Sequence, residues 1–353
     1  MAPHESIVIV GAGIIGLDVA LVLAEKGFGQ CTTVVAEYLP GDTAHTYTSP
    51  WAGCNFSAIS SADPAALKWD KAGYLHLQNL AATDSRNSFV RKTPSVELWD
   101  DNVPHEKIEA MSEYLQDFRT LSNDELPQGV KFAASFTTLT VNAPKHLLYL
   151  YRRLKDEYGV QFIRRTLSNI REAFVTESTE VIFNCTGIGA RALPGVEDSR
   201  CYPTRGQVLL AKAPDVNTNI MRHGKDYETY VIPRPYSGGH VILGGYMQKD
   251  NGDGATYSHE SDSILSRTME LSSEVKGSDP EVIAAFAGLR PSRKGGARVE
   301  REDMVIAGLN RAVIHNYGAG GTGFQAGYGM ALDAVHAAEP FLFGLKHRDR
   351  ARI

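Results

Sequence analysis

The first forty residues carry a hydrophobic pattern that predicts a strand, a glycine turn, a helix and a second strand. Residues 6–10 form a short β-branched run, which is typical of a strand buried on both faces of a parallel sheet. Apolar positions then recur at helical spacing until Gly27, where a helix is expected to stop. Residues 31–36 are a second apolar run, which ends at Glu37. The order predicts a β-α-β unit at the start of the chain.

The turn inside this unit reads Gly11-Ala12-Gly13-Ile14-Ile15-Gly16. Gly11 allows the tight turn, Gly13 lets backbone N–H groups approach a pyrophosphate, and Gly16 lets the helix pack closely on the strand. The phosphate charge would lie at the helix N-terminus, where unpaired N–H groups and the helix dipole favour an anion. Glu37 stands near the spacing of the carboxylate that binds ribose hydroxyls. The pattern predicts a dinucleotide site and leaves NAD and FAD open.

The apolar stretch from residue 7 to residue 24 could also be a signal peptide or a membrane span. The residues before it include no Lys or Arg, and no small-residue cleavage site follows it. Asp18 and three glycines interrupt the stretch, whereas a membrane helix needs about 20 apolar residues. We therefore expect a buried strand and helix here, and no membrane segment.

The rest of the chain mixes helical and strand patterns. A turn-rich, irregular connection is expected over residues 41–60, and such a long connection is usually functional. Helices are predicted at residues 65–80, 107–119, 145–157, 261–272, 279–286 and 325–342, and strands at 96–99, 136–141, 160–164, 181–185, 207–211, 229–232, 240–244 and 312–316. The elements predict an α/β fold in which a discontinuous Rossmann-like domain (1–60, 140–205 and 295–353) receives an inserted, β-rich domain (61–139 and 206–294).

Composition supports an ordinary globular protein of about two domains. The chain has 353 residues, of which 43% are hydrophobic and 22% are charged. A formal net charge of −5 makes a general nucleic-acid-binding surface improbable, so no nucleic-acid partner is expected. The four cysteines form no C-x-x-C pair, which argues against a disulfide framework or a structural zinc site and favours a reducing compartment. We expect no metal.

A second glycine-rich turn near the C-terminus changes the cofactor prediction. Residues 318–323 follow the predicted strand at 312–316 and precede a predicted helix. The N-terminus of this second helix would also stabilise negative charge. Since the pyrophosphate is expected at the first helix, the second must face another electron-rich group. The pyrimidine edge of a flavin gains negative charge on two-electron reduction and would suit this position. The second turn therefore favours FAD over NAD.

Seven motifs in order resemble those of the D-amino acid oxidases of fungi, a family that includes D-aspartate oxidases. They are VGAGIIGL, TSPWAGCNF, VIFNCTGIGA, TRGQVLL, YVIPRP, GLRPSRKGG and HNYGAGGTGFQ. The resemblance implies a Rossmann-like FAD domain and a substrate domain with a large mixed sheet. It also implies hydride transfer from the substrate Cα to flavin N5, which gives an imino acid that water hydrolyses to a 2-oxo acid and ammonia. O2 then reoxidises the flavin and yields hydrogen peroxide.

The resemblance implies the site residues as well. Arg290 matches the arginine that holds the substrate carboxylate, and a planar guanidinium suits that role because it donates two parallel charge-assisted bonds. Tyr230 matches a tyrosine whose hydroxyl also holds the carboxylate, and Asn55, Gln325 and Gly321 match positions near the flavin and the substrate. The expected FAD-contacting residues are Gly11, Ala12, Gly13, Ile14, Ile15, Gly16, Glu37, Tyr38, Thr46, Thr48, Gly53, Asn55, Leu167, Thr186, Gly187, Gly320, Gly321, Thr322, Gly323, Phe324 and Gln325.

Two departures from the family pattern bear on the substrate. Met247 stands where relatives can carry a second tyrosine, and its neighbour Tyr246 would point to the other face of a regular strand. Met221 matches a pocket-wall residue, but it begins a basic stretch with Arg222 and Lys225. If either cation faced the substrate, an acidic side chain would be favoured, as in D-aspartate oxidases. We expect a solvated loop here, and therefore neutral D-amino acids.

Other readings stay open at this stage. They are D-aspartate oxidase, an oxidase of glycine, sarcosine or a glycated amine from the same superfamily, an NAD-linked dehydrogenase, and a non-catalytic dinucleotide-binding protein. Relatives suggest a homodimer. The last residues, Ala351-Arg352-Ile353, have the pattern of a peroxisomal signal, so a peroxisomal import receptor is an expected partner and the cytoplasm is the alternative location.

Overall fold

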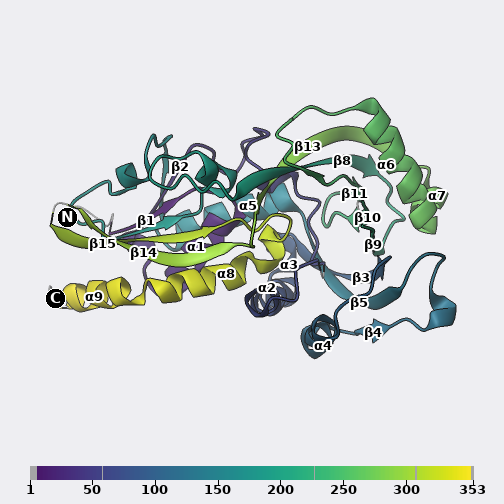
Figure 1. Ribbon diagram of the computed structural model, residues 1–353, viewed down its shortest axis with the longest axis horizontal. Helices are drawn as coiled ribbons and strands as arrows, with labels where there is room; N and C mark the ends of the chain where they lie inside the picture. The colour runs from purple at the N-terminus through teal and green to yellow at the C-terminus, as the bar shows by residue number, and fades with distance from the viewer. Residues whose placement is uncertain (1–5, 58, 226, 307, 351–353) are drawn as a thin grey trace.

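The computed structural model describes residues 6–57, 59–225, 227–306 and 308–350, and it builds them around two β-sheets (Figure 1). The first sheet has six strands in the order β14-β15-β7-β1-β2-β6. Its strands are β1 (Ile7–Val10), β2 (Thr32–Ala36), β6 (Gln161–Arg164), β7 (Val181–Asn184), β14 (Arg298–Ile306) and β15 (Leu309–Tyr317). All neighbours pair in parallel except β14, which pairs antiparallel with β15 at the edge.

Both faces of this first sheet are buried, and successive side chains of β1 pack on opposite faces. Ile7 and Ile9 pack with the helices α1 (Ile14–Glu25), α5 (Ala143–Arg152), α8 (Gly323–Ala337) and α9 (Glu339–Arg350). Val8 and Val10 contribute to a smaller core on the opposite face, which includes residues of the short turn η5 (Ile170–Ala173). The β-branched run at the start of the chain is therefore a strand buried from both sides, as its sequence predicts.

The second sheet has nine strands and is mixed. Eight follow the order β12-β8-β11-β10-β9-β3-β5-β4, and β13 pairs with β8. The strands are β3 (Val90–Trp99), β4 (Arg119–Thr120), β5 (Phe132–Val141), β8 (Cys201–Lys212), β9 (Asn219–His223), β10 (Glu228–Pro233), β11 (His240–Gly244), β12 (Gln248–Lys249) and β13 (Glu281–Arg293). The pair β3–β9 is parallel, whereas β8, β9, β10 and β11 pair antiparallel along the sheet.

The two faces of β8, β10 and β11 have different neighbours. Leu209, Val231 and Leu243 pack against α6 (Ser258–Leu271) and α7 (Ser273–Ser278), which flank this sheet in Figure 1. Residues of the other face, including Tyr230, form a separate cluster. The remaining elements are α2 (Pro64–Thr83), α3 (Ser85–Ser88), α4 (His105–Tyr114) and the short turns η1 (Gly29–Cys31), η2 (Ser49–Trp51), η3 (Asn123–Glu125), η4 (Arg153–Glu157) and η6 (Gly187–Arg191).

Most predicted elements are confirmed, and some predictions are wrong. The alanine-rich residues 279–286, predicted as a helix, begin strand β13, where Ala284 and Ala285 pair with β8. Pairing with a long neighbouring strand overrides the helix propensity of alanine there. The helix predicted over residues 107–119 ends at Tyr114, and the one over 325–342 divides into α8 and α9. Strand β14 was not predicted, because an edge strand can carry charged residues that hide its apolar pattern.

Candidate active site

One cavity of about 1110 Å³ lies where the carboxyl ends of β1, β2 and β7 meet the second sheet. Ligands of open α/β sheets bind at this end of the strands. All the predicted cofactor and catalytic residues line this cavity except Gly16. A Cβ atom on Gly16 would lie 2.0 Å from the carbonyl oxygen of Gly11, so Gly16 serves the close helix–strand approach that its position in the motif predicts.

The turn between β1 and α1 forms one wall of the cavity. Gly11 has φ +108° and would meet the carbonyl oxygen of Cys185 at 2.4 Å if it carried a Cβ atom, so only glycine fits. The irregular segment before η2 supports the turn, because the Tyr47 hydroxyl donates to the Ala12 carbonyl (2.7 Å) and the Ile14 N–H donates to Ser49 Oγ (3.1 Å). Gly13, the N-cap of α1, has no side chain that could cover the helix end.

The second glycine-rich turn, at the N-terminus of α8, also lines the cavity and lies beside the first, since a Cβ atom on Gly323 would lie 3.4 Å from Ile14. The hydroxyl of Thr322, the N-cap residue, donates back to the Ala319 carbonyl (2.8 Å), so it does not cap the helix N–H groups. The Gly320 N–H donates to the carbonyl of Pro291 in β13 (2.9 Å). A Cβ atom on Gly321 would lie 3.7 Å from Arg290 Cδ. The turn therefore sits directly beside the predicted carboxylate-binding arginine.

Arg290 and Tyr230 converge in the cavity from two different strands. Arg290 Nη1 donates to the Tyr246 carbonyl (3.0 Å), and Nη2 lies 3.5 Å from the Tyr230 hydroxyl. Burial raises the pKa of Tyr230, so its phenol stays protonated and can donate. Two glycines make room: a Cβ atom on Gly206 would lie 2.2 Å from Arg290 Nη1, and one on Gly244 would lie 2.2 Å from the Tyr230 ring. The arrangement presents a cation and a hydroxyl to one point.

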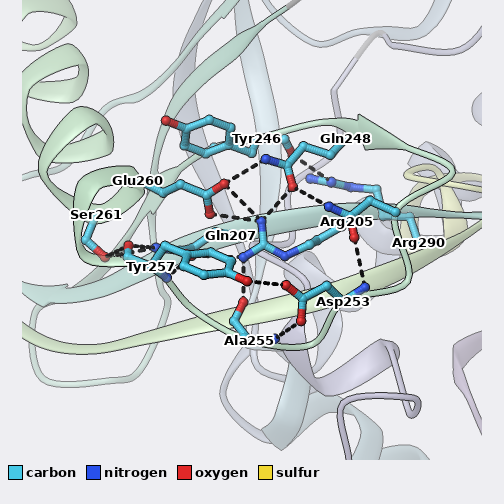
Figure 2. Close-up of polar contacts among 12 residues, drawn as sticks. Arg205, Gln207, Tyr246, Gln248, Asp253, Ala255, Tyr257, Glu260, Ser261 and Arg290 are labelled. Atoms are coloured by element: carbon cyan, nitrogen blue, oxygen red, sulfur yellow. Dashed lines mark hydrogen bonds and ion pairs between the residues drawn. The ribbon is translucent and has the colours of Figure 1, made fainter.

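A buried polar network supports residues 246–248, whose Tyr246 carbonyl accepts the hydrogen bond from Arg290 (Figure 2). Arg205 is fully buried, and its Nη1 donates to Glu260 Oε2 (2.9 Å) and to Gln248 Oε1 (2.7 Å). Gln248 Nε2 donates in turn to Glu260 Oε1 (2.7 Å). Because Gln248 is two residues from Tyr246, the network anchors the backbone whose carbonyl accepts from Arg290. The sequence motif TRGQ contains Arg205, but its pattern gave no reason to predict this contact.

The same segment settles the orientation of Tyr246 and Met247. Met247 lines the cavity, whereas the Tyr246 ring packs toward α6, with the Arg267 guanidinium 5.4 Å from its centroid. The alternation that the sequence predicts is confirmed, so a thioether rather than a phenol borders this part of the pocket.

Gln325 lines the cavity, but its amide is engaged by the protein. Its Nε2 donates to Ser60 Oγ (3.0 Å) and to Asp70 Oδ1 (3.0 Å), and its Oε1 accepts from the Ser57 N–H (3.2 Å). Burial raises the pKa of Asp70 to about 6. Gln325 therefore ties α8 to the segment after Phe56 and to α2, and its amide atoms face these partners.

The solvated loop expected around Met221 is wrong in part, because residues 219–223 form strand β9 between β10 and β3. Met221 is buried and lines the cavity, where its sulfur contacts Asn55 Nδ2 (3.1 Å). Arg222 points to the other side of the strand, and its Nε bonds to Asp100 (3.0 Å). Lys225 is exposed, and among the described residues neither cation lines the cavity.

A buried acidic cluster beside Tyr230 was not predicted. His223 lies between two carboxylates, with Nε2 3.1 Å from Glu97 and Nδ1 3.5 Å from Glu228. Burial disfavours the cation, but the hydrogen bonds to Glu228 and Glu97 and their charges raise the pKa of His223 to about 9. Ser57 Oγ also donates to Glu97 (3.0 Å). Glu228 precedes Tyr230 by two residues, so strand alternation could have placed it on the cavity face.

Comparisons with known proteins agree with this geometry. Residues 6–337 match the family model described as FAD dependent oxidoreductase. A D-amino-acid oxidase of Schizosaccharomyces pombe is 45% identical, and the alignment covers 95% of this chain and 97% of the relative. A D-aspartate oxidase of Cryptococcus neoformans is 32% identical over 93% of this chain and 95% of the relative.

Solved structures share the fold at lower identity. A glycine oxidase from Geobacillus kaustophilus matches with a TM-score of 0.70 and 18% identity, covering 95% of this chain and 94% of the other. An L-proline dehydrogenase from P. horikoshii matches with a TM-score of 0.72 and 16% identity over 96% and 93% of the two chains. Within the described residues, no helix combines the length and apolar character that a membrane span requires.

Proposed function

Because the chain belongs to the family of FAD-dependent oxidoreductases, we propose that it oxidises D-amino acids with neutral side chains to 2-oxo acids, ammonia and hydrogen peroxide. The observation that carries the proposal is the convergence of Arg290 and Tyr230 beside the second glycine-rich turn. Together they form a binding point for a carboxylate within a cavity that also has room for a dinucleotide.

The residues present fit FAD. Two helix N-termini open onto the cavity, and neither N-cap residue covers its helix end with a side chain. The glycine-rich turn before α1 lines the cavity at the helix N-terminus, where a pyrophosphate would bind, and Glu37 lines it after β2, where a ribose would lie. When bound there, FAD would supply the acceptor for the hydride of the substrate Cα and the reductant that turns O2 into hydrogen peroxide.

We assign the protein's own part in the reaction to binding and orientation. The Arg290 guanidinium would hold the α-carboxylate by two parallel charge-assisted bonds, and the Tyr230 hydroxyl would donate a third. With its carboxylate held there and Gly321 forming the adjoining wall, the substrate would present one face of Cα to the flavin. This orientation is the main requirement of hydride transfer. Asn55 is proposed to contact the bound molecules. Gln325 is proposed as a positioning residue, because its amide is held by Ser57, Ser60 and Asp70.

Stereospecific release of hydrogen peroxide tests the proposal. The purified, FAD-loaded protein is assayed for peroxide with D- and L-alanine, D-aspartate, glycine and sarcosine. We expect activity on D-alanine, little on D-aspartate and none on L-alanine. Preference for D-aspartate would make the chain a D-aspartate oxidase, and preference for glycine or sarcosine would place it among the amine oxidases. Activity confined to L-alanine would contradict the proposal.

We also propose that the two sheets mark two domains. The strands of the six-stranded sheet fall within residues 1–60, 140–205 and 295–353. Strands β3, β4, β9, β10, β11, β12 and β13 fall within 61–139 and 206–294, while β5 and β8 of the same sheet cross the limits of these segments by a few residues. FAD would bind to the first domain, and the second would supply Tyr230 and Arg290.

Location and assembly are further parts of the proposal. The tripeptide Ala351-Arg352-Ile353 lies outside the described residues, and its pattern supports recognition by a peroxisomal import receptor. A fluorescent fusion that ends in the natural tripeptide should enter peroxisomes, whereas one that lacks it should stay in the cytoplasm. The family resemblance supports a homodimer, which sedimentation equilibrium would test.

A further inference from the structure

The cavity wall beside Tyr230 carries a fixed negative charge. Glu228 lines the cavity, and its side chain is 12% exposed. In the β9–β10 pair, Tyr230 lies opposite Met221 and Glu228 lies opposite His223. Residues two apart on a strand share a face, so these four side chains lie on the cavity side. Thr229, between Glu228 and Tyr230, points the other way, because its hydroxyl accepts from Arg267 of α6 (2.6 Å).

The cluster behind Glu228 keeps this carboxylate ionised. Burial acts to raise its pKa, but the hydrogen bond from His223 and the charges of His223 and Arg290 hold the pKa of Glu228 below its usual value. Glu97 on β3 binds the other nitrogen of His223 and is fully buried. Two carboxylates therefore share one imidazolium, which leaves a net charge of about −1 at this wall when both carboxylates are ionised.

Other charges near the cluster do not cancel this excess. Lys107 is buried, donates to the Ser60 carbonyl (2.8 Å) and feels the charges of both Glu97 and Asp70. Its amine lies beside Ser60, whose hydroxyl donates to Asp70 of α2, and Lys107 is not among the described residues that line the cavity. The Arg290 guanidinium also acts on Glu228 by its charge. Under the proposed function the substrate carboxylate binds this guanidinium and neutralises it, so the negative charge of the cluster remains.

We propose that Glu228, positioned by His223 and Glu97, determines substrate specificity by charge. It rejects D-amino acids with anionic side chains and adds to the neutral substrates those whose side chain ends in a cation, which it favours. This inference rests on the proposed D-amino acid oxidase activity and extends it to a substrate class. A like charge placed close to a buried carboxylate is repelled, and an opposite charge there is attracted.

Two pairs of substrates that differ mainly in side-chain charge test the inference. D-lysine is compared with D-norleucine, and D-glutamate with D-glutamine, by the ratio of kcat/KM within each pair. In Glu228→Gln the first ratio should fall and the second should rise, each by about tenfold, as expected for one charge in a partly buried site. Glu228→Asp keeps the charge and should retain the direction of both wild-type preferences.

Asp100→Asn is the matched control. Asp100 is a carboxylate bound to Arg222 on the opposite side of β9, and it is not among the described residues that line the cavity. If Glu228 acts locally, this control should leave both ratios within about twofold of wild type, since a more distant charge is screened. Ratios that shift equally in Glu228→Gln and Asp100→Asn would show a general charge effect and overturn the inference. Ratios unchanged in Glu228→Gln would also overturn it.

A second measurement avoids substitution, in case Glu228→Gln fails to fold. The wild-type protein is titrated with pentanoate, 5-aminopentanoate and glutarate, and binding is followed by the flavin absorbance spectrum. Glutarate should bind at least about tenfold more weakly than pentanoate, and 5-aminopentanoate should bind at least as well as pentanoate. Equal binding of glutarate and pentanoate would overturn the inference. If the wild-type protein oxidises none of these D-amino acids and no D-alanine either, the proposed function itself fails.

Discussion

At the scale of single residues, the proposed site depends on the planar fork of Arg290. Arg290→Ala removes both charge-assisted bonds to the carboxylate, so we expect KM for D-alanine to rise by about 100-fold or more. Arg290→Lys keeps the charge but loses the bidentate geometry and should recover only part of this loss. Steady-state kinetics measure the effect, and an unchanged flavin spectrum shows that the cofactor is still bound.

Tyr230→Phe is the companion variant at this scale. It removes one hydroxyl and leaves the ring that packs against Gly244, so KM should rise by only about fivefold to tenfold, the value of one hydrogen bond. An Arg290→Ala protein with a normal KM would show that the guanidinium does not hold the carboxylate. Loss of the flavin in that variant would instead assign Arg290 a structural role.

At the scale of elements, the Arg205–Glu260 pair joins β8 to α6 and supports the segment that carries Tyr246 (Figure 2). Glu260→Gln leaves a fully buried guanidinium bonded to uncharged groups such as Gln248, Gln207 and the Ala255 carbonyl, and we expect it to lower the free energy of unfolding by about 3 kcal/mol. The double variant Arg205→Met, Glu260→Met replaces both charges by apolar side chains and should cost clearly less. Chemical denaturation of the three proteins measures the difference.

The two outcomes of that comparison are distinct. If the double variant is the least stable of the three proteins, the Arg205–Glu260 pair stabilises the fold by more than it costs to bury its two charges. KM is the second readout: both variants should raise it by loosening the Tyr246 carbonyl from Arg290, whereas a purely structural pair would change stability alone. Lys71→Gln, which removes an exposed ion pair with Glu113, is the control and should change neither quantity measurably.

The elements also show how far the sequence alone could lead. The β1-α1-β2 unit and the strand at residues 240–244 were predicted because their apolar residues recur at strand or helix spacing and glycines mark the turns beside β1, α1 and β11. Strand β13 was mistaken for a helix in part, since its alanines gain their strand conformation only from pairing with β8. The Glu97–His223–Glu228 cluster includes Glu97, a residue of β3 that lies more than 120 residues before β9 and β10, so no local pattern could reveal the whole cluster.

At the scale of the whole molecule, the cavity exists only because the two sheets keep a fixed relation. Asp198 stands at their junction. It accepts from Arg293 Nε at the end of β13 (2.7 Å) and from the Tyr317 hydroxyl at the end of β15 (3.0 Å). One carboxylate therefore ties the last residue of a strand in the second sheet to the last residue of a strand in the first. β15 leads into the glycine-rich turn that lines the cavity, and β13 lines the cavity itself at Arg290, Pro291 and Ser292.

This junction should make the stability of the molecule depend on acid. Burial acts to raise the pKa of Asp198, but the bonds from Arg293, the Arg200 N–H and Tyr317 lower it to about 2. In the unfolded chain the pKa returns to about 3.9, so the folded state binds fewer protons between these values. The contribution, about 2 kcal/mol, is complete above about pH 5 and is lost as the pH falls toward 2.

Asp198→Asn should therefore unfold more easily than wild type at pH 6, while the two proteins should converge as the pH approaches 2. Thermal unfolding at several pH values measures this difference. Asp303→Asn removes an exposed carboxylate bound to Arg301 and should follow the wild-type curve throughout. A stability gap between Asp198→Asn and wild type that is the same at pH 6 and pH 3 would show that the carboxylate stabilises the junction by packing alone, and that its charge does not hold the two sheets together.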